Sequence, residues 1–211
     1  MSGKSNCPVR GRPKDVGKRV DILEAARSLF LQRGFHGTSM DALAKQACVS
    51  KATLYSHYED KAALYRALIN DKMAAYEIDD FTAKLSWDMA QDLRYIAAHL
   101  LDLIYDPDAL DMLRMVISEG REGSDVPHLF AEAGPKRVLG QIADYLNAQK
   151  QRGLSYLGEP VQDAELFSSL VVGHAPLMFA LTGVEPPMAP NTRKERAGQA
   201  ATQFIALKQS D

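Results

Sequence analysis

The chain has 211 residues, and its 46% hydrophobic and 25% charged residues are typical of a globular protein with a substantial core. The net charge of −2 conceals an asymmetry, because residues 1–72 carry 13 Lys and Arg against 7 Asp and Glu, while the rest carries 12 against 20. Two cysteines are too few for a disulfide framework or a cysteine-rich metal site, and the basic N-terminal part favours a polyanionic partner.

Residues 1–17 combine glycine and proline with basic side chains, a composition that buries too little apolar surface to order itself. We therefore expect a flexible basic arm. The arm lacks the apolar stretch of a secretory signal or a transit peptide, so we expect the protein to be cytoplasmic.

Residues 18–72 are predicted to form a small domain of closely spaced helices. Apolar residues recur at helical spacing in the first of them, and Gly34 provides its stop signal. The predicted helices cover Lys18–Arg33, a short stretch that ends near Ala47, Lys51–Tyr58, and Lys61 to about Glu77.

Two capping patterns punctuate this domain. Thr38 and Asp41 have the spacing in which a threonine hydroxyl accepts an unpaired amide and a carboxylate faces the positive end of the helix. We therefore expect Thr38 to cap the second helix. Ser50 offers a second cap, which starts the third helix at Lys51.

The stretch MDALAKQACVSKATLYSHYE, residues 40–59, has the layout of a helix-turn-helix. Its apolar positions are expected to face inward, with the small Ala44 where two helices cross. They are Leu43, Ala47, Val49 and Leu54. The third helix should then expose a polar and aromatic surface that can reach phosphates and base edges in a major groove. That surface comprises Lys51, Thr53, Tyr55, Ser56, His57 and Tyr58.

Residues 73–211 follow a helical pattern throughout, so the predicted fold is all-α. We expect Pro176 to kink the longest apolar helix, with Gly173 absorbing the bend. This apolar run falls short of the roughly 20 residues that span a membrane. The predicted helices are Asp88–Tyr105, Pro107–Gly120, Pro127–Ala133, Pro135–Arg152, Val161–Leu181 and Asn191–Lys208.

The segment from Thr38 to Leu64, TSMDALAKQACVSKATLYSHYEDKAAL, resembles the signature of the tetracycline-repressor (TetR) family. The resemblance implies an N-terminal three-helix DNA-binding domain followed by a helical effector-binding and dimerisation domain over residues 73–211. It implies that Thr38 and Lys61 hold phosphates and that the fourth helix couples effector binding to operator release. It also implies that the third helix reads the groove through residues 50–58, including Ser50 and Ala52.

Two positions depart from the family pattern. Cys48 occupies a turn position where the family usually has glycine, and a left-handed backbone there would store strain on the order of 1 kcal/mol. His57 and Tyr58 replace the usual Tyr-Phe pair, which puts the target sequence in doubt more than DNA binding itself. Cys48 has two interpretations, a small apolar filler or a redox sensor beside the DNA.

Arg10 and Arg12 lie in a short Arg-Gly-Arg-Pro segment that resembles a minor-groove hook, in which an extended arm lays arginines into a narrow groove. The alternative is a merely solubilising tail. The position of the segment directly before a helix-turn-helix favours contact with DNA.

The second domain is rich in methionine and aromatic residues, which suit an apolar ligand pocket between helices. We expect its wall to include Tyr95, His99, Met112, Met115 and His128. The histidines lack the spacing of metal sites, and no nucleophile elbow, phosphate loop or zinc motif occurs. We therefore predict no catalytic residues, no cofactor, no metal and no enzymatic activity.

The sequence thus predicts a DNA-binding transcription regulator, which we interpret as a repressor released from a palindromic operator by a small, largely apolar effector. Dimerisation is expected through the helices near 161–181 and 191–208, because the first is apolar nearly all round. The alternatives are a nucleoid-type architectural DNA-binding protein without effector control and an interaction protein that has lost DNA binding.

Overall fold

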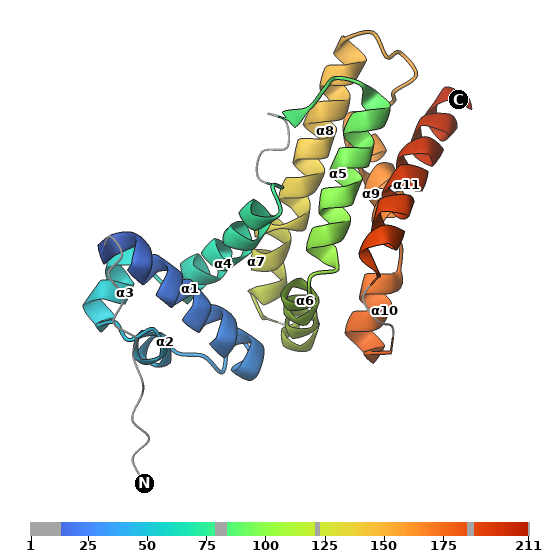
Figure 1. The fold of residues 1–211 in the computed structure, drawn as a ribbon. Helices are drawn as coiled ribbons and strands as arrows, with labels where there is room; N and C mark the ends of the chain where they lie inside the picture. The colour runs from blue at the N-terminus through green and yellow to red at the C-terminus, as the bar shows by residue number, and fades with distance from the viewer. Residues whose placement is uncertain (1–13, 79–83, 121–122, 185–187, 211) are drawn as a thin grey trace. The chain divides into compact units, whose positions relative to one another are not determined.

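The computed structural model describes residues 14–78, 84–120, 123–184 and 188–210, and every regular element in these ranges is a helix (Figure 1). The all-α prediction is therefore confirmed. The chain divides into two compact units, Met1–Leu68 and Ile69–Asp211.

The first unit is built around the apolar face of its longest helix. Ile22, Ala26, Leu29 and Phe30 recur at helical spacing and are all buried. The amide of Gly34, whose φ is 73°, donates to the carbonyl of Phe30 and ends this helix. The helices of the unit are α1 (Lys14–Arg33), α2 (Met40–Gln46), α3 (Lys51–His57) and the first part of α4 (Lys61–Ala75).

The cap of α2 differs from the prediction. Ser39 is the N-cap residue, and its hydroxyl accepts a hydrogen bond from the amide of Ala42. Thr38 is only 2% exposed, and its hydroxyl donates to the carbonyl oxygens of Leu29 at 3.2 Å and Gly34 at 2.8 Å. The prediction that Thr38 caps α2 is wrong, because this side chain turns back to secure the end of α1.

The turn between α2 and α3 adopts the backbone that glycine would favour. Cys48 has a φ of 54°, in the left-handed region that is strained for a residue with a Cβ. The amide of the next residue, Val49, donates to the carbonyl of Ala44 and closes the turn. The turn therefore stores on the order of 1 kcal/mol of backbone strain.

The second unit is a bundle of helices around a common core. α5 packs against α9 and α11, α8 packs against α7 and α9, and α6 packs against α7 and α10 (Figure 1). Asp88 and Asp106 cap α5 and α6 by accepting amide hydrogen bonds. Beyond α4, the helices are α5 (Met89–Ile104), α6 (Pro107–Glu119), α7 (Val126–Ala133), α8 (Pro135–Gln151), α9 (Pro160–Val172), α10 (Ala175–Thr182) and α11 (Pro190–Ser210).

The expected single helix over Val161–Leu181 is in fact two helices. α9 ends at Val172, α10 begins at Ala175, and their axes are bent by 59°. Gly173, with φ 62° and ψ −156°, breaks the chain direction between them. The prediction of a kinked helix is therefore wrong, because the backbone at Gly173 leaves the helical region altogether.

None of the described helices is by itself long and apolar enough to cross a membrane. The bent pair of α9 and α10 passes the test of length and composition when the two are taken together.

Candidate nucleic-acid interface and ligand cavity

Helix α3 has one buried side and one exposed side. Leu54 is fully buried in the first unit, whereas Lys51, Ala52 and Tyr55 face solvent, with Tyr55 51% exposed. The Ser50 hydroxyl caps the helix by accepting from the amide of Thr53 at 3.0 Å. The exposed side thus combines a cation, hydroxyl groups and an aromatic ring, groups that can contact phosphates and base edges.

Lys51 is held in a bridge from α3 to α2. Its ammonium lies 2.6 Å from a carboxylate oxygen of Asp41, and both side chains are nearly two-thirds exposed. Exposed ion pairs of this kind contribute little to stability. Lys51 can therefore exchange Asp41 for a phosphate at small cost.

Tyr58 does not belong to the exposed side of α3. It is 9% exposed, and its hydroxyl is buried without a hydrogen-bond partner among the described residues. Tyr58 follows Leu54 by four positions, so it lies on the same inward face. The prediction that Tyr58 is displayed to DNA is wrong, while its neighbour His57 is half-buried.

Lys61 contacts the turn between α1 and α2. Its ammonium donates to the carbonyl oxygens of Phe35 at 2.6 Å and Thr38 at 2.8 Å, and it lies 4.4 Å from the centroid of the Phe35 ring. The partly buried Lys61 and the buried Thr38 thus both stabilise this turn. Arg10 and Arg12 lie outside the described residues.

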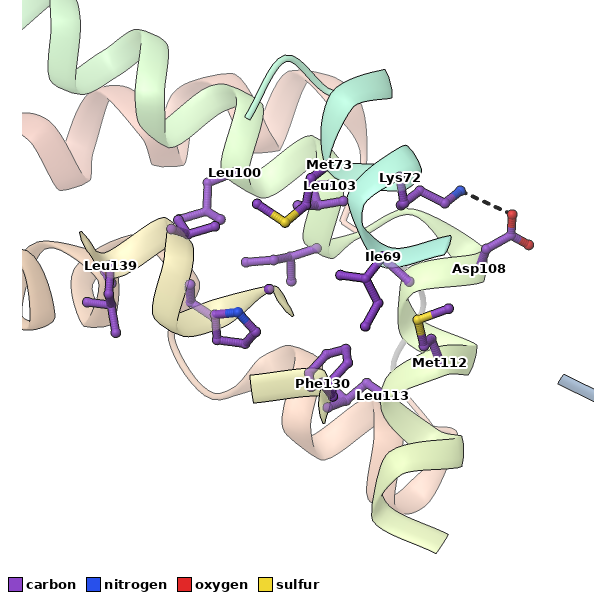
Figure 2. Close-up of a pocket in the computed structure, with 17 residues that line it drawn as sticks. Ile69, Lys72, Met73, Leu100, Leu103, Asp108, Met112, Leu113, Phe130 and Leu139 are labelled. Atoms are coloured by element: carbon purple, nitrogen blue, oxygen red, sulfur yellow. Dashed lines mark hydrogen bonds and ion pairs between the residues drawn. The ribbon is translucent and has the colours of Figure 1, made fainter. Parts of the chain in front are cut away.

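A cavity of about 300 Å³ lies in the second unit, surrounded by residues of α4 to α9 (Figure 2). Most of its wall is made by aliphatic side chains, methionines and one aromatic ring. Examples are Ile69, Met73, Leu100, Leu103, Met112 and Phe130. Lys72, Asp108 and Ser168 are the polar side chains among the described residues that line it.

An ion-pair network borders this cavity. The Lys72 ammonium donates to Asp106 at 2.8 Å and to Asp108 at 3.1 Å, and the Tyr76 hydroxyl donates to Asp106 at 2.7 Å. Figure 2 shows the Lys72–Asp108 pair at the edge of the apolar side chains. The network joins the C-terminal half of α4 to the N-terminus of α6.

The pKa shifts of Lys72 and Asp106 favour their charged forms at neutral pH. Burial lowers the pKa of Lys72, but hydrogen bonds to Asp106 and Asp108 outweigh it and raise the pKa overall. Burial also opposes ionisation of Asp106, yet hydrogen bonds from Lys72, Tyr76 and the Ala109 amide lower its pKa. Burial and the hydrogen bond to Asp106 raise the pKa of Tyr76 to about 12.

The predicted pocket wall agrees with this cavity only at Met112. The rings of Tyr95 and His99 lie 4.3 Å apart between centroids with their planes tilted by 48°. Tyr95 hydrogen-bonds to Glu77, and His99 hydrogen-bonds to the Tyr76 carbonyl. Met115 and His128 do not line the cavity either: Met115 is buried in the core, and His128 is exposed.

The cavity lies at the C-terminal end of α5, where Leu100, Leu103 and Ile104 face it. Tyr95 and His99 precede this end on the same helix, and residue type alone does not reveal the depth along a helix at which a cavity opens. Tyr95, His99, Met115 and His128 therefore do not line this cavity, and their contact with an effector stays a prediction.

The wall residues that were not predicted from the sequence include its three polar side chains, Lys72, Asp108 and Ser168. A signal was available only for Ser168, which interrupts an otherwise apolar run. Lys72 and Asp108 look like ordinary charged residues on helix surfaces until the fold brings them together. Within the described ranges no three His, Cys, Asp or Glu side chains are grouped so that they could hold a metal ion.

Two family profiles match the chain. Residues 22–68 match the profile described as bacterial regulatory proteins of the tetR family, and residues 91–209 match that of the AefR-like transcriptional repressor C-terminal domain. The first match covers the helix-turn-helix. The second covers more than half of the chain.

Individual proteins are similar over most of their length. The uncharacterized regulator YvkB of Bacillus subtilis is 25% identical over 72% of this chain and 78% of its own, and SrpR of Pseudomonas putida is 23% identical over 74% and 72%. A putative TetR-family regulator from Mesorhizobium loti has a similar structure, with a TM-score of 0.74 and 23% identity over 93% and 98% of the two chains. The flavonoid-responsive regulator FrrA has a TM-score of 0.66 and 29% identity over 90% and 96%.

Proposed function

Because the chain belongs to the tetR family of bacterial transcription regulators and carries an AefR-like C-terminal domain, we propose that it is a repressor controlled by a small molecule. In this proposal it leaves its operator when a largely apolar effector binds in the C-terminal domain. The family consists of DNA-binding regulators and not of enzymes.

The observation that carries the proposal is the apolar cavity of about 300 Å³. This volume lies at the lower end of the range for small-molecule sites. The similarity to a flavonoid-responsive regulator also supports control by a small molecule. An effector that binds one conformation of the cavity better than another supplies the free energy for a switch.

Helix α4 supports a link between effector and operator. Its first half places Leu64, Tyr65 and Leu68 in the core of the DNA-binding unit, and its second half places Ile69 and Lys72 in the cavity wall. The same helix therefore belongs to both parts of the proposed mechanism. We propose that it transmits the effector signal.

On the DNA side, we propose that α3 reads the major groove through its exposed side. The proposed contacts are Ser50, Lys51, Ala52, Thr53, Tyr55 and His57, with Arg10 and Arg12 of the arm in the minor groove. Thr38 and Lys61 are proposed to hold the turn that presents a phosphate-binding surface. Tyr58 is not among the proposed contacts because its side chain is buried.

We propose that the protein is a dimer through α9, α10 and α11. These helices carry exposed apolar side chains that a second copy would cover: Val161, Leu166, Leu177, Met178, Leu181 and Leu207. A two-fold dimer presents two copies of α3, so the operator should be roughly palindromic.

The test is selection of bound sequences from a random DNA pool, with the protein and with a Lys51→Ala, Tyr55→Ala double variant. A palindromic motif that the variant no longer recovers is the expected result. Recovery of no motif would contradict the proposal and favour the architectural alternative. A footprint on the recovered operator is then challenged with apolar small molecules, and a footprint that none of them dissolves would contradict effector control.

A further inference from the structure

Ser168 is unusual among the helical hydroxyls of the second unit. Its neighbour Ser169 donates to the carbonyl of Glu165, and Thr202 donates to the carbonyl of Gly198, in the usual back-bonded pattern. The Ser168 hydroxyl oxygen is buried in the cavity wall without a hydrogen-bond partner among the described residues. A buried hydroxyl of this kind is costly unless something else satisfies it.

The charged side chains of the wall, in contrast, satisfy each other. Lys72 is shared between Asp106 and Asp108, so one cation faces two carboxylates. An ionised acid would compete with both carboxylates for Lys72 and approach them closely. An amine would compete with Lys72 for Asp108. Either ion would therefore lose its hydration, and the group of opposite charge that it meets is already held in an ion pair.

From these contacts we infer that the effector is an uncharged, largely apolar molecule with one hydrogen-bonding oxygen, which the Ser168 hydroxyl anchors. This inference rests on the proposed function and names the ligand class of the same cavity. The Lys72–Asp108 pair closes the polar edge of the cavity to ions. The apolar wall encloses the rest of the molecule.

The first experiment compares three ligands with the same hydrocarbon chain, decanol, decanoate and decylamine, at about pH 7.5, where the acid and the amine are ionised. Each displaces the neutral fluorescent probe N-phenylnaphthylamine from the full-length protein. We expect decanol to displace the probe at a concentration at least about tenfold lower than either ion, the equivalent of one unfavourable polar contact. Equal or better displacement by either ion would overturn the inference.

The second experiment tests the anchor with adjacent serines. Ser168→Ala should weaken decanol binding about two- to tenfold, the worth of one hydrogen bond. The probe itself, which lacks an oxygen, should bind this variant as before. Ser169→Ala is the matched control, because Ser169 is exposed and bonded to its own helix. Equal effects of the two substitutions would overturn the role of Ser168.

The third experiment tests exclusion of acids. Asp108→Asn removes one carboxylate from Lys72 and should improve decanoate binding several-fold, while decanol binding changes little. Asp111→Asn, also on α6 but exposed and 3.8 Å from Arg114, is the control and should leave decanoate binding unchanged. Unchanged decanoate binding in Asp108→Asn would overturn the role of the ion pair.

The proposed function is read out separately, by release of the operator. Decanol that binds with these preferences but leaves the operator bound would contradict effector control and leave the ligand class intact. Operator release by decanoate through the same cavity would support effector control and overturn the ligand class. Leu113→Trp, which fills the cavity, should abolish probe binding, and an unchanged affinity would overturn this cavity as the site.

Discussion

Thr38 and Ser39 are adjacent hydroxyl residues with different roles. Ser39 satisfies an amide at the start of α2, whereas Thr38 satisfies two carbonyls at the end of α1. Sequence patterns for caps cannot separate neighbours of this kind, because both residue types occur at caps and only burial distinguishes them.

Substitutions at the two positions should have distinguishable costs. We expect Ser39→Ala to lower the free energy of unfolding by about 1 kcal/mol, the usual cost of a lost cap. Thr38→Val keeps the shape but leaves two carbonyls without their donor, and should cost about 1–3 kcal/mol. Urea denaturation followed by circular dichroism measures both. A Thr38→Val protein as stable as the unsubstituted one would contradict the buried role.

Lys51 is expected to contribute to DNA binding through phosphate. Lys51→Ala should weaken operator binding and reduce the slope of log K against log salt by about 1. Lys136→Ala is the matched control, since Lys136 is also an exposed lysine paired with a carboxylate, that of Glu132. Fluorescence anisotropy over a salt series gives both slopes, and identical slopes for the two variants would refute a phosphate contact by Lys51.

Some roles of individual residues in and next to α3 could be predicted from the sequence, and others could not. Ser50 could be predicted as a cap and Lys51 as exposed, because both follow from local patterns. Tyr58 could not be placed correctly, since a tyrosine is compatible with either the core or the surface. Its burial follows from the helical register set by Leu54.

At the scale of elements, the break between α9 and α10 depends on one glycine and one arginine. Arg196 of α11 donates to the carbonyls of Leu170 and Val171 at the end of α9. A Cβ on Gly173 would lie 2.6 Å from the Arg196 guanidinium, in a backbone conformation that only glycine adopts readily.

Gly173→Ala should therefore lower the free energy of unfolding by more than about 1 kcal/mol. Gly140→Ala is the control, because Gly140 lies inside α8 with open space around its would-be Cβ. That substitution should be neutral or stabilise the protein by up to about 1 kcal/mol. Thermal denaturation of both variants checks the pair, and equal changes would argue against the strain at Gly173.

Because of the ion-pair network between α4 and α6, the stability of the protein should depend on pH. The lowered pKa of Asp106 means that its contribution to stability is present above the unfolded value of about 3.9 and is lost as pH falls through the folded value. The raised pKa of Lys72 means that its contribution is present below about 10.4 and is lost as pH rises through the folded value.

Asp106→Asn should thus be less stable than the unsubstituted protein at neutral pH, with a difference that shrinks below about pH 4. Asparagine retains the cap of α6, so the comparison isolates the charge. Urea denaturation at a series of pH values measures the difference. A difference that stays constant down to acid pH would contradict the ion pair.

Most helices were predictable within a few residues of their ends, because caps and first-turn prolines are local signals. Pro107 and Pro135 begin α6 and α8 as expected. The break at Gly173 was not predictable, since a proline in an apolar run is equally compatible with a kinked helix and with two separate helices. The contact with Arg196, which is distant in sequence, accompanies the break.

At the scale of the molecule, the exposed apolar residues of α10 predict the oligomeric state. Leu177 and Leu181 are 52% and 59% exposed, four positions apart on one face. A Leu177→Arg, Leu181→Arg double variant should be monomeric by analytical ultracentrifugation. It should bind a palindromic operator about a hundredfold more weakly, because each half-site is then bound alone.

Ile117→Arg is the control for that variant, since Ile117 is an exposed apolar residue of α6 that lies outside the proposed interface. It should remain dimeric. A double variant with the same mass as the control would place the interface elsewhere.

The sequence predicted the all-helical fold and the regulator family, because the helix-turn-helix signature is short and continuous. It predicted a boundary after residue 72, whereas the compact units divide at Leu68 within α4. The position of the cavity could not be predicted from the sequence. Its wall is assembled from six helices and depends on how each is rotated and how far along it the neighbours cross.

The cavity wall and the proposed DNA-contacting side of α3 are made by different residues, which has a consequence for engineering. The cavity is lined by residues between Ile69 and Val172, and α3, which we propose contacts the groove, ends at His57. Exchanges among leucine, isoleucine and methionine keep the packed volume and usually cost less than about 1.5 kcal/mol. A library restricted to wall positions such as Leu100, Leu103 and Met112 could therefore yield biosensors that respond to new compounds while acting on the same promoter.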